Sequence, residues 1–115
     1  MSFPRLPDEF VQELLDGMET MGRTYALAKA RRAGLEEQRK MKKNELMVVA
    51  EEGEDIRQFN KQERFAYSHP AYRAVVDEYV AAVQAEAEAE YALELFRMRF
   101  EAWRTVSAND RATLR

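Results

Sequence analysis

Cysteine is absent from the 115 residues of the sequence, and histidine occurs once, at His69. Without cysteine, neither a disulfide framework nor a thiolate metal site can form. A di-iron site in a helical bundle needs two Glu-x-x-His pairs, but Ala66 stands three residues before His69 and there is no second histidine. We therefore expect no metal site and no cofactor.

Glycine and proline are also scarce, with four and three residues, whereas hydrophobic residues make up 46% of the chain and charged residues 34%. This composition favours long amphipathic helices over sheets. No run approaches the roughly 18 consecutive apolar residues of a membrane span. The first ten residues, MSFPRLPDEF, lack the basic and apolar regions of a signal peptide. We expect one all-α domain, residues 1–115, in the cytoplasm and without membrane contact.

Groups able to perform catalysis are few. The sequence has no glycine-rich phosphate loop. Neither Ser68 nor Ser107 has a candidate base on the same predicted element, so neither is a good candidate nucleophile. We expect that the protein is not an enzyme and has no catalytic residue.

The first helix begins at a clear signal. Proline suits the first position of a helix, and two acidic residues follow Pro7, where they favour the positive end of the helix dipole. The segment EEGED, residues 51–55, places a glycine among like charges with nothing apolar to bury, which predicts a break. These signals predict a long helix over residues 7–51.

A connection over residues 52–69 follows, and it contains a short helix. Asn60 begins the sequence NKQE, in which a glutamate three residues after an asparagine is typical of a capping box. At the end of the connection, Ser68 or His69 is expected to cap the next helix, because Pro70 then occupies its first position.

The second long helix is predicted over residues 70–105. The sequence SAND, residues 107–110, is another possible capping box. It predicts a separate short C-terminal turn over residues 107–115.

Apolar residues recur along both long helices at alternating spacings of four and three, which is typical of a heptad seam. Two long helices joined by a compact connection favour an antiparallel, coiled-coil-like hairpin. More apolar residues lie beside the seam than one hairpin can bury, which favours dimerisation into a helical bundle. The predicted core seam consists of Leu14, Met18, Met21, Tyr25, Leu35, Leu46, Val75, Tyr79, Leu93, Phe96, Phe100 and Trp103.

A basic block, residues 29–43, interrupts the first seam in a chain of net charge −3. In the hairpin it falls opposite residues 77–91, which carry five acidic side chains and no basic one. Charges of opposite sign along two helices fix their register, and we expect Arg32 and Glu86 to be a register pair. An alternative is a nucleic-acid strip, for which the candidate contacts are Arg39, Lys40, Lys42 and Lys43.

The same register pairs the two ends of the chain. The acidic start of the first helix falls opposite a stretch with several arginines, and Trp103 falls opposite Gly17, a large residue against a small one. Around the connection, three aromatic residues form a possible partner-binding face: Phe65, Tyr67 and Tyr72.

Two segments, NKQERFAYSHPAYRAVVDEY and RFEAWRTVSANDR, resemble small helical proteins encoded in the early regions of tailed phages and prophages. The resemblance covers roughly residues 35–111. It rests on Glu63-Arg64 with Ala66-Tyr67 and Tyr72, then on Trp103-Arg104 with Asn109 and Arg111. Genes of this class tend to lie near those of single-strand-binding, annealing or exonuclease proteins, so the resemblance implies a role in DNA recombination or replication in an infected or lysogenic bacterium.

Three functions remain open from the sequence. The first is a non-enzymatic accessory protein of phage DNA recombination or replication, which acts through protein contacts with weak binding of single-stranded DNA. The second is an inhibitor of a host nuclease or defence complex, in which the acidic residues of segments 51–55 and 86–94 mimic DNA phosphates. The third is a purely structural coiled-coil dimer. The expected partners are a second copy of the chain and a phage or host DNA-processing protein.

Overall fold

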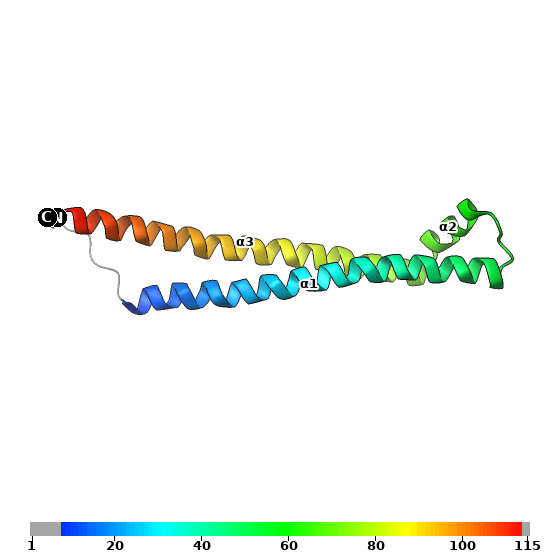
Figure 1. Ribbon diagram of the computed structural model, residues 1–115, viewed down its shortest axis with the longest axis horizontal. Helices are drawn as coiled ribbons and strands as arrows, with labels where there is room; N and C mark the ends of the chain where they lie inside the picture. The colour runs from blue at the N-terminus through cyan, green and yellow to red at the C-terminus, as the bar shows by residue number, and fades with distance from the viewer. Residues whose placement is uncertain (1–7, 114–115) are drawn as a thin grey trace. The chain divides into compact units, whose positions relative to one another are not determined.

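The computed structural model describes residues 8–113, so the predicted start at Pro7 lies outside the described residues. These residues are all-α, and their three helices are connected as a helical hairpin with a short helix between the two long ones, as predicted. Figure 1 shows their order along the chain. No strand occurs in the described part, and no helix there is long and apolar enough to cross a membrane.

Helix α1 (Asp8–Gly53) has 46 residues and ends two residues beyond the predicted boundary. The Ala50 carbonyl accepts hydrogen bonds from the backbone N–H groups of Glu54 at 3.3 Å and Ile56 at 2.9 Å. The chain then reverses through Asp55, whose φ of 53° is left-handed. Aspartate tolerates this conformation better than most residues do, so the acidic break predicted from the sequence also supplies the turn.

Helix α2 (Phe59–Ser68) begins before Asn60, and the predicted capping box is wrong. Its N-cap is Gln58, whose side chain makes no capping hydrogen bond. Instead the Gln58 carbonyl accepts from the N–H groups of Lys61 and Gln62, at 3.1 and 3.0 Å. Backbone bonds alone start this helix, and a capping-box motif cannot reveal such a start.

Helix α3 (Pro70–Thr113) starts where the sequence predicted, with His69 as the capping residue. The Nδ1 atom of His69 accepts a hydrogen bond from the Ala71 N–H at 3.0 Å, and its carbonyl accepts from the N–H groups of Tyr72 and Arg73. This is the N-capping role in which a side chain satisfies a free N–H group of the first turn.

The end predicted near residue 105, with a separate turn over 107–115, is wrong, because α3 continues to Thr113. The heptad spacing extends through Ser107 and Asp110, which are half-buried like the seam residues before them. Neither glycine nor proline follows Pro70 in the helix, and nothing in the sequence therefore breaks it.

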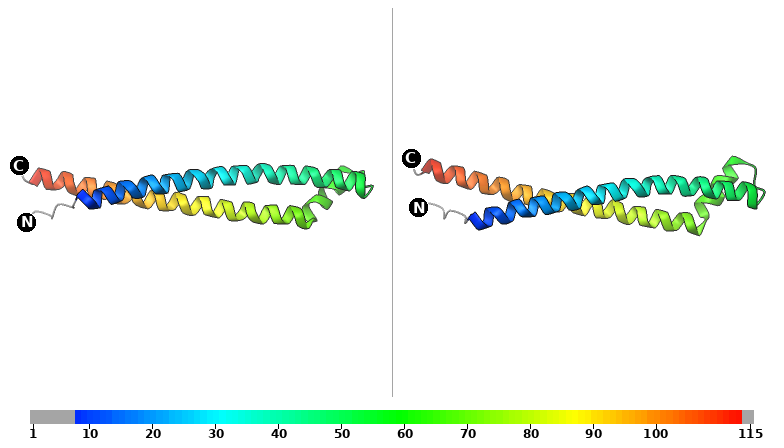
Figure 2. Two further views of the ribbon diagram at one scale, coloured as in Figure 1. Left: turned by 90° about the horizontal axis from the view of Figure 1, so that it is seen from below. Right: turned by 60° about the horizontal axis from the view of Figure 1, so that its bottom comes forward.

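Two compact units make up the fold. The central unit is Ala28–Glu86, in which α1 and α3 run side by side in opposite directions with α2 at their connection (Figures 1 and 2). The terminal unit joins Met1–Leu27 to Ala87–Arg115, and its described parts are one segment of α1 and one of α3.

The core of each unit lies on the predicted seam. Among the predicted seam residues, the buried ones are Leu14, Leu35, Leu46 and Leu93. The others are half-buried, namely Met18, Met21, Tyr25, Val75, Tyr79, Phe96, Phe100 and Trp103. Two helices cover only one side of a seam, so large side chains extend past its edge.

Gly17 lies against Phe96 in the terminal unit, and the predicted match with Trp103 is wrong. A Cβ atom on Gly17 would overlap the Phe96 ring, with Cζ only 2.7 Å away. Trp103 packs instead beside Phe100, with 5.5 Å between ring centroids. A large aromatic residue does lie against Gly17, as expected. The register expected for the hairpin, however, assigned Trp103 to this position instead of Phe96.

Candidate functional site

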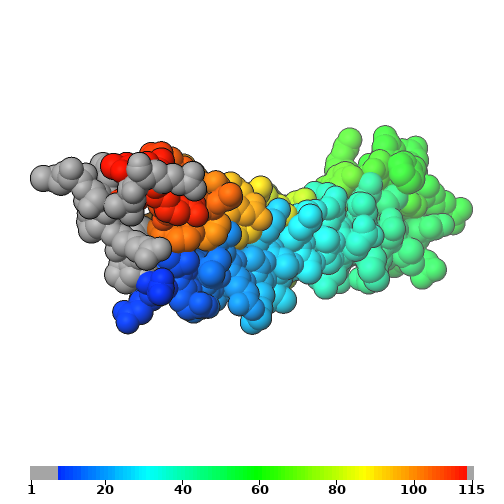
Figure 3. Space-filling model, turned by 60° about the vertical axis from the view of Figure 1, so that its left-hand side comes forward, coloured from blue at the N-terminus to red at the C-terminus, as the bar shows by residue number. Residues whose placement is uncertain are grey.

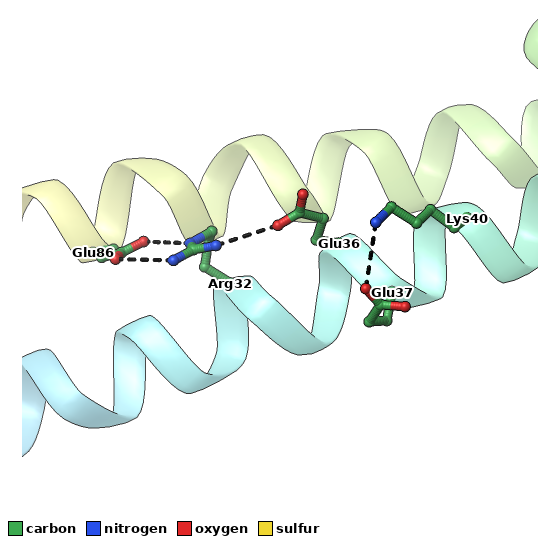
Figure 4. Close-up of polar contacts among 5 residues, drawn as sticks. All are labelled: Arg32, Glu36, Glu37, Lys40 and Glu86. Carbon is green, nitrogen blue, oxygen red and sulfur yellow. Dashed lines mark hydrogen bonds and ion pairs between the residues drawn. The ribbon is translucent and has the colours of Figure 1, made fainter.

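Five of the seven cations in the basic block contact other groups of the central unit, beginning with Arg32. Arg32 Nε donates to Glu86 Oε2 at 2.7 Å and Nη2 donates to Oε1 at 3.4 Å, across from α1 to α3. Nη1 donates to Glu36 Oε2 at 3.3 Å, so the guanidinium lies between two carboxylates (Figure 4). The pairing that the sequence predicted is therefore present, and its role in fixing the register stays a prediction.

Protonation of the Arg32–Glu86 pair follows from this geometry. The hydrogen bond from Arg32 lowers the pKa of the Glu86 carboxyl, and its charge acts in the same direction against partial burial. The hydrogen bond to Glu86 likewise raises the pKa of Arg32. Both groups are therefore held in their charged forms, and a planar guanidinium facing a carboxylate through two bonds also fixes their relative orientation.

The candidate nucleic-acid contacts have partners within the central unit. Arg39 lies over the ring of Tyr79, with 4.8 Å to the centroid. Lys40 pairs with Glu37 at 3.4 Å on the exposed side of α1 (Figure 4). These two cations are placed on one helix, but one faces α3 and the other a carboxylate of its own helix, so they do not form a common strip.

The remaining two candidate contacts behave in the same way. Lys42 pairs with Glu45 of its own helix at 3.0 Å. Lys43 donates to Glu63 Oε2 of α2 at 2.8 Å, and its Nζ lies 5.0 Å from the centroid of the Tyr67 ring. The bond to Glu63, together with the contact to Tyr67, raises the pKa of Lys43. Lys43 thus joins α2 to α1.

The predicted aromatic face is divided between two ring pairs. Tyr67 and Tyr72 meet edge to face with centroids 5.4 Å apart, and the Phe65 ring lies 5.7 Å from that of His69. Phe65 and Tyr72 are half-buried, whereas Tyr67 is exposed. Of the three predicted residues, Tyr67 alone is therefore exposed, at 46% of its surface.

Beside Tyr67 lies a shallow hollow of about 560 Å³ between α2 and the start of α3. Its two arginines, Arg64 and Arg73, have no ion-pair partner among residues 8–113. Sequence reasoning assigned no contact to them, although Arg64 lies within the motif that carries the phage resemblance. The sequence does contain a sign that Arg64 is unpaired, because neither residue four positions away from it on the same helix is acidic.

Large apolar side chains remain exposed on the outer helix faces of the central unit. Met41, Val48 and Val49 of α1 and Val80 and Val83 of α3 are each at least two-fifths exposed. On the face drawn in Figure 3, the α1 atoms of this unit form much of the surface. Exposed apolar side chains mark a protein contact surface where they form a contiguous patch.

The acidic segment 51–55 lies at the surface. All four of its carboxylates are exposed, and Asp55 pairs with Arg57 at 3.1 Å. No group of three or more acidic or histidine side chains within residues 8–113 is placed to hold a metal ion.

Comparison with protein-family models, with curated proteins and with solved structures finds no match for this chain.

Proposed function

We propose that this chain is a non-enzymatic accessory protein of phage DNA recombination or replication, and that it acts mainly through protein contacts in the cytoplasm of the bacterial host. The place in phage DNA metabolism rests on the resemblance of the Glu63-Arg64 and Trp103-Arg104 motifs. The mode of action rests on the structure of the central unit.

One contrast carries the proposal. The candidate DNA contacts are engaged, two of them with α3 or α2 and two with carboxylates of α1, whereas the valines of the outer α3 face are open. Phosphate binding requires lysines and arginines that exchange counterions for DNA. A cation that is already paired with a carboxylate must give up that pair to bind a phosphate, which reduces the free energy gained by binding DNA. The affinity for single-stranded DNA is therefore weak, and protein contacts dominate.

An annealing assay tests this function. Two complementary labelled oligonucleotides would be annealed by a phage annealing protein, with and without this chain, at low and at near-physiological salt. We expect a changed annealing rate together with weak binding of the chain alone to either oligonucleotide. The direct contacts are tested by replacing Lys40, Lys42 and Lys43 with glutamine, and the matched control replaces Arg97, Arg99 and Arg104.

Three outcomes would replace the proposal. Tight, salt-sensitive binding that only the lysine variant loses would make the chain a direct DNA-binding protein. An unchanged annealing rate together with a tight complex that blocks a nuclease would support the inhibitor, for which the exposed carboxylates of segment 51–55 are the candidate DNA mimic. A chain that affects neither reaction would be a structural coiled-coil protein.

A further inference from the structure

Helix α3 carries a second stripe beside its core seam, which we call the outer stripe. Each of its residues directly follows a buried or half-buried residue of α3, in order Tyr72, Val75, Tyr79, Ala82, Glu86 and Ala89. The stripe therefore lies about 100° around the helix from the inward-facing side. It consists of Arg73, Val76, Val80, Val83, Ala87 and Glu90. Because all six residues lie on one continuous helix, their spacing follows from helix geometry alone.

The outer stripe is open along its length. Val80 is 58% exposed and Val83 41% exposed, and Val76 is half-buried. Arg73 and Glu90 at the two ends are exposed. An apolar stretch that is bounded by a cation at one end and a carboxylate at the other is not a usual solvent-facing pattern, in which polar residues occupy the whole outer face.

The pattern of the stripe is self-complementary. About a two-fold axis between Ala81 and Ala82, Val80 falls opposite Val83 of an antiparallel copy, and Val76 falls opposite Ala87. The same axis brings Arg73 opposite Glu90 at both ends. The alternating spacing of three and four is that of an antiparallel coiled coil, in which such positions form successive layers.

The end residues are available for this pairing. Neither Arg73 nor Glu90 has an ion-pair partner within residues 8–113. Arg73 also lines the hollow that contains Arg64, which likewise has no ion-pair partner in the described part of the chain. The Arg73 end is therefore basic, and the Glu90 end belongs to the acidic run Glu86, Glu90 and Glu94.

We propose that a second copy of this chain docks antiparallel on the outer stripe, with Arg73 of each copy paired to Glu90 of the other. Charge complementarity selects this occupant, because a self-matching stripe satisfies both of its ends only in a two-fold arrangement. The inference rests on the part of the proposed function that assigns protein contacts to the outer faces, and it names the partner.

Sedimentation equilibrium of the full chain tests the surface. Val80→Lys places a charge in the middle of the stripe, and the matched control is Val106→Lys, at a valine that is 40% exposed on α3 beyond the stripe. We expect the parent chain and the control to dimerise, and the dissociation constant of Val80→Lys to rise at least about tenfold. Circular dichroism checks that both variants remain helical. A monomeric parent chain, or a dimer that Val80→Lys leaves unchanged, would overturn the proposal.

Charge reversal tests the register independently of apolar contact. Arg73→Glu and Glu90→Arg each place like charges at both ends of their own dimer, so each alone is expected to dissociate. An equimolar mixture restores opposite charges at both ends and is expected to form a heterodimer. If the mixture gains nothing over the separate variants, the antiparallel register is wrong.

The two proposals fail in different ways. A monomeric chain that still changes the annealing rate would overturn the dimer alone. A dimer that Val80→Lys dissociates, without any effect of the parent chain on annealing, would overturn the role in recombination alone. If the parent chain is monomeric and its outer stripe binds the annealing protein, then the occupant of the stripe is the annealing protein. That result would overturn the proposal that a second copy of the chain docks there.

Discussion

The two units of the molecule are held by different kinds of contact. In the central unit, polar groups join separate helices, as Arg32 joins Glu86 and Lys43 joins Glu63. In the terminal unit, the ion pairs of Arg97 and Arg104 stay within their own helix, and an aromatic ring fills the space over a glycine. Ionic contacts thus join separate helices in one unit, whereas in the other the contact between helices is one of matched shape.

The difference corrects one expectation from the sequence. Opposite charges occur on the facing segments of both units, but at the chain ends Arg97 pairs with Glu94 three residues away. A partner one turn away on the same helix is always within reach, whereas a partner on another helix must be brought close by packing. Complementary charge along two helices therefore predicts cross-helix pairs only where the seam itself presents them, as at Arg32 and Glu86.

Replacing Gly17 disturbs its close contact with Phe96 in the terminal unit, and it has the largest expected effect. Gly17→Ala puts a methyl group into the Phe96 ring, which must shift, at a cost of about 1–3 kcal/mol. Gly22→Ala is the matched control, since nothing lies within 4 Å of its Cβ position, and there the gain in helix propensity should stabilise by up to about 1 kcal/mol. Urea unfolding measures both. Equal shifts of the midpoint would mean that Phe96 does not depend on Gly17.

Neutralising Glu86 removes the ionic contact between α1 and α3 in the central unit. Because Arg32 lowers the pKa of Glu86, the stabilisation is present above the ordinary value of 4.5 and is lost as the pH falls through the lower folded-state value. Glu86→Gln should therefore lower Tm at neutral pH, and the difference from the parent chain should shrink in acid. Glu94→Gln, which removes a pair that lies on one exposed helix face, is the control and should change Tm less. A Tm difference that is independent of pH would show that the effect of Glu86 is not ionic.

Removing Lys43 tests the ionic contact between α1 and α2, and it has the smallest expected effect of the three substitutions. Its hydrogen bond to Glu63 raises its pKa, so the stabilisation is present below the ordinary value of 10.5 and is lost as the pH rises through the folded-state value. At neutral pH, Lys43→Met should speed amide hydrogen exchange in α2 severalfold, because local opening becomes easier. Lys40→Met, whose partner is on α1 itself, should leave α2 unchanged. Equal exchange in the two variants would show that Lys43 does not hold α2.

The heptad pattern made the fold predictable, and local signals did not fix its details. Burial of Leu35 and Leu46, and the contact of Arg32 with Glu86, follow from repeated spacing over many turns. The start of α2 after its N-cap Gln58 rests on backbone bonds that leave no residue signature. The bond between Lys43 and Glu63 depends on how α2 packs, and no periodicity within ten residues specifies that packing.

Two hydrogen bonds of the Ile56 backbone hold the chain reversal to the helices on either side of it. Its N–H donates to the Ala50 carbonyl of α1, and its carbonyl accepts from Gln62 Nε2 of α2 at 2.8 Å. Proteases cleave a backbone that they can draw out into an extended strand, and these two bonds oppose that extension. Trypsin should therefore cut slowly after Arg57, although the side chain of that residue is 84% exposed. An exposed bend of the hairpin would then be resistant to digestion.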